Sequence, residues 1–488
     1  MKKRQFVFGF LVLSILLSFS YQAFCSTLDV FEVPPGSGLY GYPYGAVPTQ
    51  SYFPGSPVLD LDAFGYIEKE FFMSGTANTY RQKGLWLNNG KWGVSVRKAN
   101  VPYTTRLIVR YPEDPNQFNG TVVVEWLNES TGTEVSPDWS DSYTYFLRKG
   151  YAYIGVTAMN GQAGVPFLKD WDSDRYSSLM LPTDGLSYDI FTQVSEAINQ
   201  FSSEILGSLR PTKILAGGDS QSAMRLSTYV NAFQPQTKAY DGFLLRGRSS
   251  LTAPLKDGIL RPYPIAFIRR DNTTPVIQVI AEGDLVELAF IMARQADTAY
   301  LRTWEIAGAA HIDVYGAAYE LALTTRDLPS LGKMECINGR LDPYTGSHLV
   351  STLPYFRIEH AAWDSLNNWV SNGIPPAKGN PIKTNFYGVI KRDKYGNALG
   401  GVRLPELDVP ISTYYYYNVG ANFMSSFVCL LGGYDELFDE ATLAALYPTH
   451  ADYVTDYTAA AQKLLKAGFL LEEDYDDAVT QAQYAPIP

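Results

Sequence analysis

A serine stands in a sharp turn between an apolar strand and a helix-like segment near the middle of the chain. Residues 217–223 read GGDSQSA and directly follow the apolar run Ile214 to Ala216. Gly218 allows the tight turn, because a larger side chain two residues before the serine would clash with the incoming strand. Ser222 replaces the second glycine of the usual G-x-S-x-G pattern and is still small. This nucleophile elbow predicts that Ser220 is a catalytic nucleophile; the alternative is a serine in an ordinary strand-to-helix turn.

A serine hydroxyl becomes a good nucleophile only when a base can take its proton, and the chain has four histidines. His311 follows a strand-like segment, residues 303–306, that passes into small residues, so its imidazole is expected on a loop at a strand's C-terminal end. We expect His348 in a polar turn, His360 in a helix and His450 at a helix start, each as a surface or capping histidine. His311 is therefore the predicted base.

A carboxylate must hold the imidazole in the correct tautomer. If the chain order is serine, acid, histidine, this acid lies between the elbow and the base. The strand Pro275 to Ile280 is followed by two carboxylates, Glu282 and Asp284. Asp284 is the predicted acid, because Gly283 frees the loop before it and aspartate is the commoner acid at this place. Glu282 is the alternative acid, and Asp313 is a weaker candidate.

The negative oxygen of a tetrahedral intermediate needs hydrogen-bond donors. The backbone N–H of Gln221, at the start of the helix, is the first predicted donor. The second is expected after the strand Thr121 to Leu127, where no lipase-type run of glycines occurs. Position alone places this donor at Asn128 or Glu129.

Further short motifs accompany the elbow in a fixed order along the chain. They lie at residues 120–128, 136–139, 150–153, 175–179, 187–191, 218–223, 307–311, 397–403 and 450–454. With these motifs the chain resembles the bacterial "alpha/beta hydrolase domain" family of often secreted proteins, from about Ile67 to about Ala478. The resemblance implies Ser220 as nucleophile, His311 as base and Asp284 as acid, and it implies no particular substrate. This chain has Asp219 where the family usually has a glutamate, a change that we expect to be tolerated.

Strand-like and helix-like segments alternate through the chain, which predicts an α/β fold. We expect the α/β-hydrolase fold, with a mostly parallel, doubly wound sheet, helices on both faces and a C-terminal extension. The expected parts are an extended N-terminal lead-in (26–65), the core (66–376, with the elbow at 218–222) and a C-terminal extension of the same domain (377–488). Expected strands include 105–111, 121–127 and 151–156, and expected helices include 141–149, 184–201, 358–370 and 452–467.

The first residues predict export. Met1 to Arg4 are basic at three positions, and Phe6 to Phe19 form an apolar stretch that is too short to span a bilayer. We therefore expect a signal peptide over residues 1–25, with cleavage after Ser20 or Cys25, and a secreted or periplasmic mature protein. Lipid attachment at Cys25 is disfavoured, because Phe24 stands where a small residue is required.

The composition excludes some partners. A formal charge of −11 over 488 residues argues against nucleic acid or an anionic membrane as partner. Metal and nucleotide motifs are absent, so no cofactor and no metal are expected. Cys336 and Cys429 can form one disulfide or stay two buried thiols. The 35 tyrosines suit either ordinary packing or an aromatic-walled cleft, and the run Tyr414 to Tyr417 can form a lid or rim.

These observations together predict a secreted serine hydrolase that acts on carboxylic esters, small or polymeric, through an acyl-enzyme. Two alternatives remain open. An amidase or acyltransferase would use the same triad, and a noncatalytic binding or surface protein could retain the fold. The sequence does not determine the oligomeric state.

Overall fold

The structure is a computed structural model that describes residues 28–35, 38–40, 50–130, 132–256, 264–329, 335–343 and 346–487. The expected signal peptide, residues 1–25, and its Cys25 lie outside the described residues. None of the described helices is both long and apolar enough to cross a membrane.

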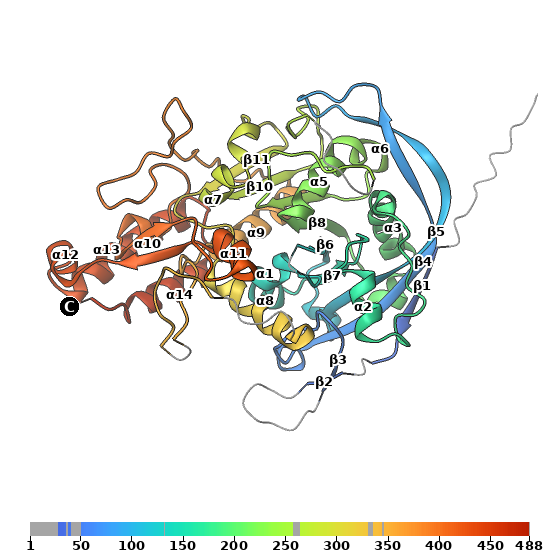
Figure 1. Ribbon diagram of the computed structural model, residues 1–488, viewed down its shortest axis with the longest axis horizontal. Coiled ribbons are helices and arrows are strands. Elements are labelled where there is room, and N and C mark those ends of the chain that lie inside the picture. The colour runs from blue at the N-terminus through green and yellow to red at the C-terminus, as the bar shows by residue number, and fades with distance from the viewer. Residues whose placement is uncertain are drawn as a thin grey trace, which may run out of the picture.

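The described residues build a nine-stranded sheet with the strand order β1-β4-β5-β7-β6-β8-β9-β10-β11 (Figure 1). Neighbouring strands from β7 to β11 run parallel, whereas β1, β4 and β5 pair antiparallel at one side. The predicted mostly parallel sheet is confirmed. The strands are β1 (Asp29–Val33), β4 (Tyr66–Lys83), β5 (Gly93–Pro112), β6 (Thr121–Trp126), β7 (Ala152–Val156), β8 (Lys213–Asp219), β9 (Gly242–Arg246), β10 (Val276–Ala281) and β11 (Leu301–Ile306).

Both faces of the sheet are covered, as the sequence predicts for a doubly wound fold. Successive side chains of a strand point to opposite faces. In β6, Val122 and Val124 accordingly join the hydrophobic cluster that contains α3 and α5. Val123 joins the cluster that contains α1 and α9. These covering helices are α1 (Pro137–Lys149), α3 (Ser187–Gln200), α5 (Gln221–Ala232) and α9 (Phe356–Asn372).

Two elements differ from the expected bounds. The first core helix, α1, begins at Pro137 rather than at residue 141, because proline suits the first turn of a helix. Strand β5 begins at Gly93, far before the expected residue 105. The first half of β5 is largely exposed. It therefore lacks the alternation of buried apolar and exposed polar residues by which a strand is recognised in a sequence.

The C-terminal elements lie at one side of the molecule in Figure 1, opposite the long β4–β5 hairpin. Cys336 and Cys429, whose pairing the sequence leaves open, form a disulfide. The elements are α10 (Pro405–Asp408), β12 (Ser412–Tyr415), α11 (Phe423–Gly432), β13 (Tyr434–Leu437), α12 (Glu440–Leu446), α13 (His450–Lys466) and α14 (Glu472–Ala482). The remaining elements are β2 (Gly38–Tyr40), β3 (Gln50–Tyr52), α2 (Val165–Trp171), α4 (Ser202–Leu206), α6 (Gln234–Thr237), α7 (Glu282–Val286), α8 (Val314–Asp327) and the 3-10 helices η1 (Asp62–Phe64), η2 (Pro115–Gln117), η3 (Asp184–Leu186) and η4 (Phe290–Ala293).

His360 corrects one prediction. Its side chain is buried, with Nδ1 lying 3.0 Å from Asp474 Oδ2 and Nε2 lying 3.2 Å from the carbonyl oxygen of Asp141. The expectation of a surface or capping histidine was wrong, because α14 packs over a position that the periodicity of α9 alone leaves open.

Candidate active site

The elbow joins β8 to α5 as the sequence pattern predicts. Ser220 has φ 55° and ψ −112°, a strained conformation for a residue other than glycine. Its N–H donates to the carbonyl oxygen of Arg246 at 3.0 Å. A Cβ atom at Gly218 would lie 2.9 Å from the Cβ of Ser222, so both positions need small residues. The turn holds Ser220 partly exposed at the start of the helix.

The predicted base and acid lie together. His311 follows β11 and Asp284 follows the neighbouring strand β10, so the carboxyl ends of two parallel strands bring them to one edge of the sheet. His311 Nδ1 lies 2.6 Å from Asp284 Oδ1, and both side chains are buried. The second oxygen of Asp284 accepts the N–H of Ala281 at 2.7 Å. Tyr355 donates to the carbonyl oxygen of His311 at 2.7 Å, which fixes the histidine backbone.

The two other carboxylates that the sequence offers have different partners. Glu282, the alternative acid, accepts a hydrogen bond from Arg392 at 2.6 Å and another from the N–H of Gly308 at 2.7 Å. Asp313 caps α8 by accepting the N–H groups of its first turn. Both carboxylates are therefore held in hydrogen bonds that support loops and a helix.

A carboxylate that the sequence analysis did not assign to the site faces the other side of the imidazole. Asp219 Oδ2 lies 3.8 Å from His311 Nε2. Gly247 allows this approach, because a Cβ atom there would lie 2.6 Å from His311 Cε1 and 2.7 Å from Asp219 Oδ1. Gly247 also has a φ of 51°, in the left-handed region that favours glycine. The strand-to-helix pattern marks Asp219 only as the neighbour of the serine, so its contact with the histidine was missed.

The charges around His311 change its protonation. Burial lowers the pKa of His311, but Asp284, Asp219 and Glu287 favour the charged imidazolium and together raise the pKa to about 9. Glu287 is a second residue that the sequence analysis missed. Both of its carboxylate oxygens are buried without a hydrogen-bond partner among the described residues, and burial raises its pKa to about 8. The surrounding carboxylates therefore favour the charged imidazolium over the neutral imidazole in the free protein.

A buried arginine on the neighbouring strand supports the elbow through its backbone. Arg246, at the end of β9, accepts the Ser220 N–H on its carbonyl oxygen and is itself 2% exposed. Its guanidinium donates to Glu359 on α9 at 2.7 Å and to Asp138 on α1 at 3.1 Å, and it also pairs with Asp141. The strand β9, which lies beside the elbow strand β8, is thus tied to both helices on this face of the sheet.

The two expected positions for the second oxyanion donor differ in their bonds. The Asn128 N–H donates to the carbonyl oxygen of Val135 at 2.9 Å, and the Asn128 side chain donates to the carbonyl oxygen of Asp219 at 3.1 Å. The Glu129 N–H instead points to the elbow, where it donates to Gln221 Oε1 at 3.3 Å. Gln221 occupies the first position of α5, where a backbone N–H has no acceptor within its own helix. Of the two positions, Glu129 therefore suits the second donor better than Asn128.

The described residues hold no group of three or more His, Cys, Asp or Glu side chains with the arrangement of a metal site.

No curated protein matches this chain. Similar solved structures include a putative dienelactone hydrolase from Klebsiella pneumoniae, with 13% identity, 47% of this chain and 85% of that chain covered, and a TM-score of 0.28. An alpha-beta serine hydrolase homologue from Coxiella burnetii has 10% identity, with 47% of this chain and 93% of that chain covered, and a TM-score of 0.29.

The family described as "Alpha/beta hydrolase domain" matches this chain over residues 32–480. The sheet order agrees with this match, because the elbow follows a central parallel strand and the histidine follows the last strand. The predicted α/β-hydrolase fold and the predicted family are confirmed. The chain belongs to the alpha/beta hydrolase domain family.

Proposed function

We propose that the protein is a serine hydrolase that cleaves carboxylic esters through an acyl-enzyme. The observation that carries this proposal is the 2.6 Å contact between His311 Nδ1 and Asp284 Oδ1, at the sheet edge where Ser220 turns outward. A neutral imidazole whose Nδ1–H is held by a buried carboxylate keeps Nε2 free to accept a proton. That arrangement is the one a serine nucleophile requires.

In the proposed reaction, Ser220 Oγ attacks the ester carbonyl carbon while its proton passes to His311 Nε2. The backbone N–H groups of Gln221 and Glu129 stabilise the oxyanion. Before the Glu129 N–H can do so, its hydrogen bond to the Gln221 side chain must break. The tetrahedral intermediate collapses, the C–O bond to the alcohol breaks, and the alcohol leaves with the proton from Nε2. Water, deprotonated by the same nitrogen, then attacks the acyl-enzyme and releases the acid and Ser220.

The reaction needs the neutral form of His311. Because the pKa of His311 is raised to about 9, the fraction of active base grows as the pH rises toward that value. We therefore propose an enzyme that hydrolyses esters best under alkaline conditions. Ester cleavage is preferred over amide cleavage by analogy with the commoner use of the fold.

Fluorophosphonate labelling tests the nucleophile directly. Wild type is expected to be labelled at Ser220 and to hydrolyse p-nitrophenyl esters of graded chain length, whereas Ser220→Ala and His311→Ala lose both properties. Ser203→Ala and His450→Ala are matched controls, because Ser203 is exposed on α4 and His450 lies at the start of α13. An unlabelled wild type would refute the catalytic proposal and leave a noncatalytic binding protein. Ester formation with an added alcohol would show acyl transfer rather than hydrolysis.

We also propose that the mature protein is exported. The Cys336–Cys429 disulfide supports this, because disulfides persist in oxidising compartments. Expression of the full chain in a Gram-negative host is expected to yield a periplasmic or secreted product cleaved after Ser20 or Cys25. Intact-mass measurement decides the point, and a product that stays in the cytoplasm with residues 1–25 attached would contradict the proposal.

A further inference from the structure

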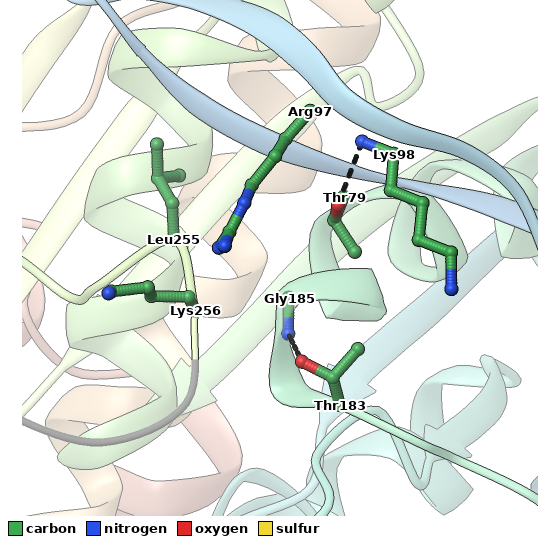
Figure 2. Close-up of a pocket in the computed structure, with 7 residues that line it drawn as sticks. All are labelled: Thr79, Arg97, Lys98, Thr183, Gly185, Leu255 and Lys256. Atoms are coloured by element: carbon green, nitrogen blue, oxygen red, sulfur yellow. Dashed lines mark hydrogen bonds between the residues drawn. The ribbon is translucent and has the colours of Figure 1, made fainter.

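A small cationic pocket lies where the β4–β5 hairpin meets two loops of the core (Figure 2). Its volume is about 210 Å³, and its lining includes Thr79, Arg97, Lys98, Thr183, Gly185 and Lys256. Figure 2 shows Arg97 extending from the hairpin toward Leu255, with Lys98 and Lys256 on opposite sides of the pocket. Three cationic side chains from two separate segments, all of them exposed, thus line one cavity.

An irregular strand pairing brings two of these cations together. Successive residues of a regular strand point to opposite faces, so Arg97 and Lys98 should point apart. The pairing of β5 with β4 shifts on both sides of Thr79, which pairs with Lys98, while Tyr80 pairs with Val96. Arg97 is therefore the extra residue of a β-bulge. Such bulges redirect side chains and are concentrated next to functional sites.

The backbone next to the bulge is irregular as well. A second shift occurs between Ala77 and Thr79, so β5 holds another extra residue between Lys98 and Val101. Asn100, within this stretch, has a φ of 55°, in the left-handed region. The hairpin thus departs from regular geometry where it presents its cations to the pocket.

The three cations that line the pocket pair with no carboxylate among the described residues. Within the described ranges, Arg97, Lys98 and Lys256 take part in none of the ion pairs. The nearby carboxylate of Asp184 is bound elsewhere, to Arg225 at 2.8 Å and to the N–H of Asn160 at 2.6 Å. In a chain with a net charge of −11, a pocket lined by three cations that pair with no described carboxylate favours an anionic occupant.

Two hydroxyl groups add neutral donors. Thr79 Oγ1 accepts the N–H of Lys98 at 3.2 Å, and Thr183 Oγ1 accepts the N–H of Gly185 at 3.1 Å (Figure 2). Because each oxygen already accepts a hydrogen bond, each hydroxyl hydrogen is left to donate to another acceptor. An oxyanion in the pocket would accept these hydrogens together with those of the cations.

The position of the pocket connects it with the elbow helix. Thr183 and Gly185 belong to the segment that follows β7, and Lys256 belongs to the segment that follows β9. Arg225, on α5 just after the elbow, reaches both segments through Asp184 and through the carbonyl oxygen of Pro254 at 3.5 Å. Both segments leave the same edge of the parallel sheet from which Ser220 emerges.

We propose that this pocket binds an oxyanion, a carboxylate, phosphate or sulfate group, either as a free small anion or as the charged end of a substrate. The volume is below the roughly 300–1,000 Å³ of sites that enclose drug-sized ligands, so a small anion or a single anionic group fits it. The strongest contacts would be charge-assisted hydrogen bonds from Arg97 and the two lysines.

Calorimetric titration with inorganic phosphate at constant ionic strength tests the site. Wild type is expected to bind, and the double variant Arg97→Gln/Lys98→Gln is expected to bind about tenfold or more weakly. The double variant Lys391→Gln/Lys466→Gln removes the same charge from exposed lysines outside the pocket and is expected to bind like wild type. Absence of binding by wild type, or equal weakening in both double variants, would overturn the proposal.

A kinetic comparison distinguishes the two sources of the anion, and this comparison alone rests on the proposed function. The substrates are a p-nitrophenyl ester of succinate, which carries a free carboxylate, and the neutral p-nitrophenyl butyrate of equal chain length. If Arg97→Gln/Lys98→Gln raises the KM for the succinate ester only, the pocket receives the substrate's own anion. If both KM values stay unchanged while phosphate binding is lost, the ligand is a free anion. If no ester is hydrolysed at all, the proposed function fails while the phosphate titration still decides the site.

Discussion

Replacing Asp219 by asparagine should shift the pH profile of the enzyme toward acid. Asp219 Oδ2 lies 3.8 Å from His311 Nε2 and favours the charged imidazolium. Removing that negative charge destabilises the imidazolium, so the neutral base persists to lower pH. The pKa of His311, raised to about 9 in the wild type, should therefore fall.

The contact distance sets the size of the shift. Two unit charges about 3.8 Å apart interact by about 4 kcal/mol at an effective dielectric constant of about 20, which corresponds to about 3 pKa units. This is an upper limit for two reasons. Arg246 offsets part of the Asp219 charge, and burial raises the pKa of Asp219 itself, so its carboxylate is not fully ionised. We expect the apparent pKa that governs the acid limb of the pH profile, the side on which activity falls as His311 is protonated, to fall by about 1 to 2 units.

The assay is kcat/KM for p-nitrophenyl butyrate between about pH 6 and pH 10, because this parameter reports the ionisations of the free enzyme. A parallel NMR titration of the His311 ring protons measures the same pKa without catalysis. Glu287→Gln should shift the limb in the same direction by less, since Glu287 makes the smaller contribution. Asp476→Asn, an exposed carboxylate on α14, is the control and should leave the profile unchanged. An acid limb that stays in place or moves upward in Asp219→Asn would refute the reasoning.

Three further predictions concern the site and its support. Asp284→Asn should lower kcat by about 10⁴-fold with an unchanged circular dichroism spectrum, because the imidazole loses its tautomer control; a loss below about tenfold would contradict the assigned acid. Gly247→Ala should lower kcat/KM by about 100-fold, since the new Cβ would lie 2.6 Å from His311 Cε1, and unchanged steady-state kinetics would contradict the close approach. Replacing Cys336 and Cys429 together by serine should lower the free energy of unfolding by about 2–5 kcal/mol in urea. Reductant should then destabilise wild type but leave this variant unaffected, and equal sensitivity would argue against the disulfide.

Much of the fold follows from local patterns. The elbow at Ser220, the strand before it and the helix after it are all encoded within about twenty consecutive residues. Asp284 and His311 could be located because each follows an apolar strand. When two neighbouring strands run parallel, the residues that follow their carboxyl ends lie at the same edge of the sheet. Their catalytic roles remain predictions.

The contacts that the sequence did not reveal join residues with no common pattern. Asp219 meets His311 only because Gly247, on a third loop, leaves space between them. The preference for Glu129 over Asn128 depends on which N–H the loop turns toward Gln221. The early half of β5 is exposed, so its residues carry no periodic signal for a strand. Such features depend on tertiary geometry, and the periodicity of the sequence carries no information about it.

The buried contacts of α14 impose an order on the synthesis of this protein. Asp474 pairs with His360 at 3.0 Å and with Arg148 at 2.9 Å, so these two side chains of α9 and α1 acquire their carboxylate partner only when α14 packs against them. On the ribosome, nearly the whole chain must emerge before these polar groups are satisfied. The polar pairing of His360 and Arg148 is therefore among the last contacts of the core to form during synthesis.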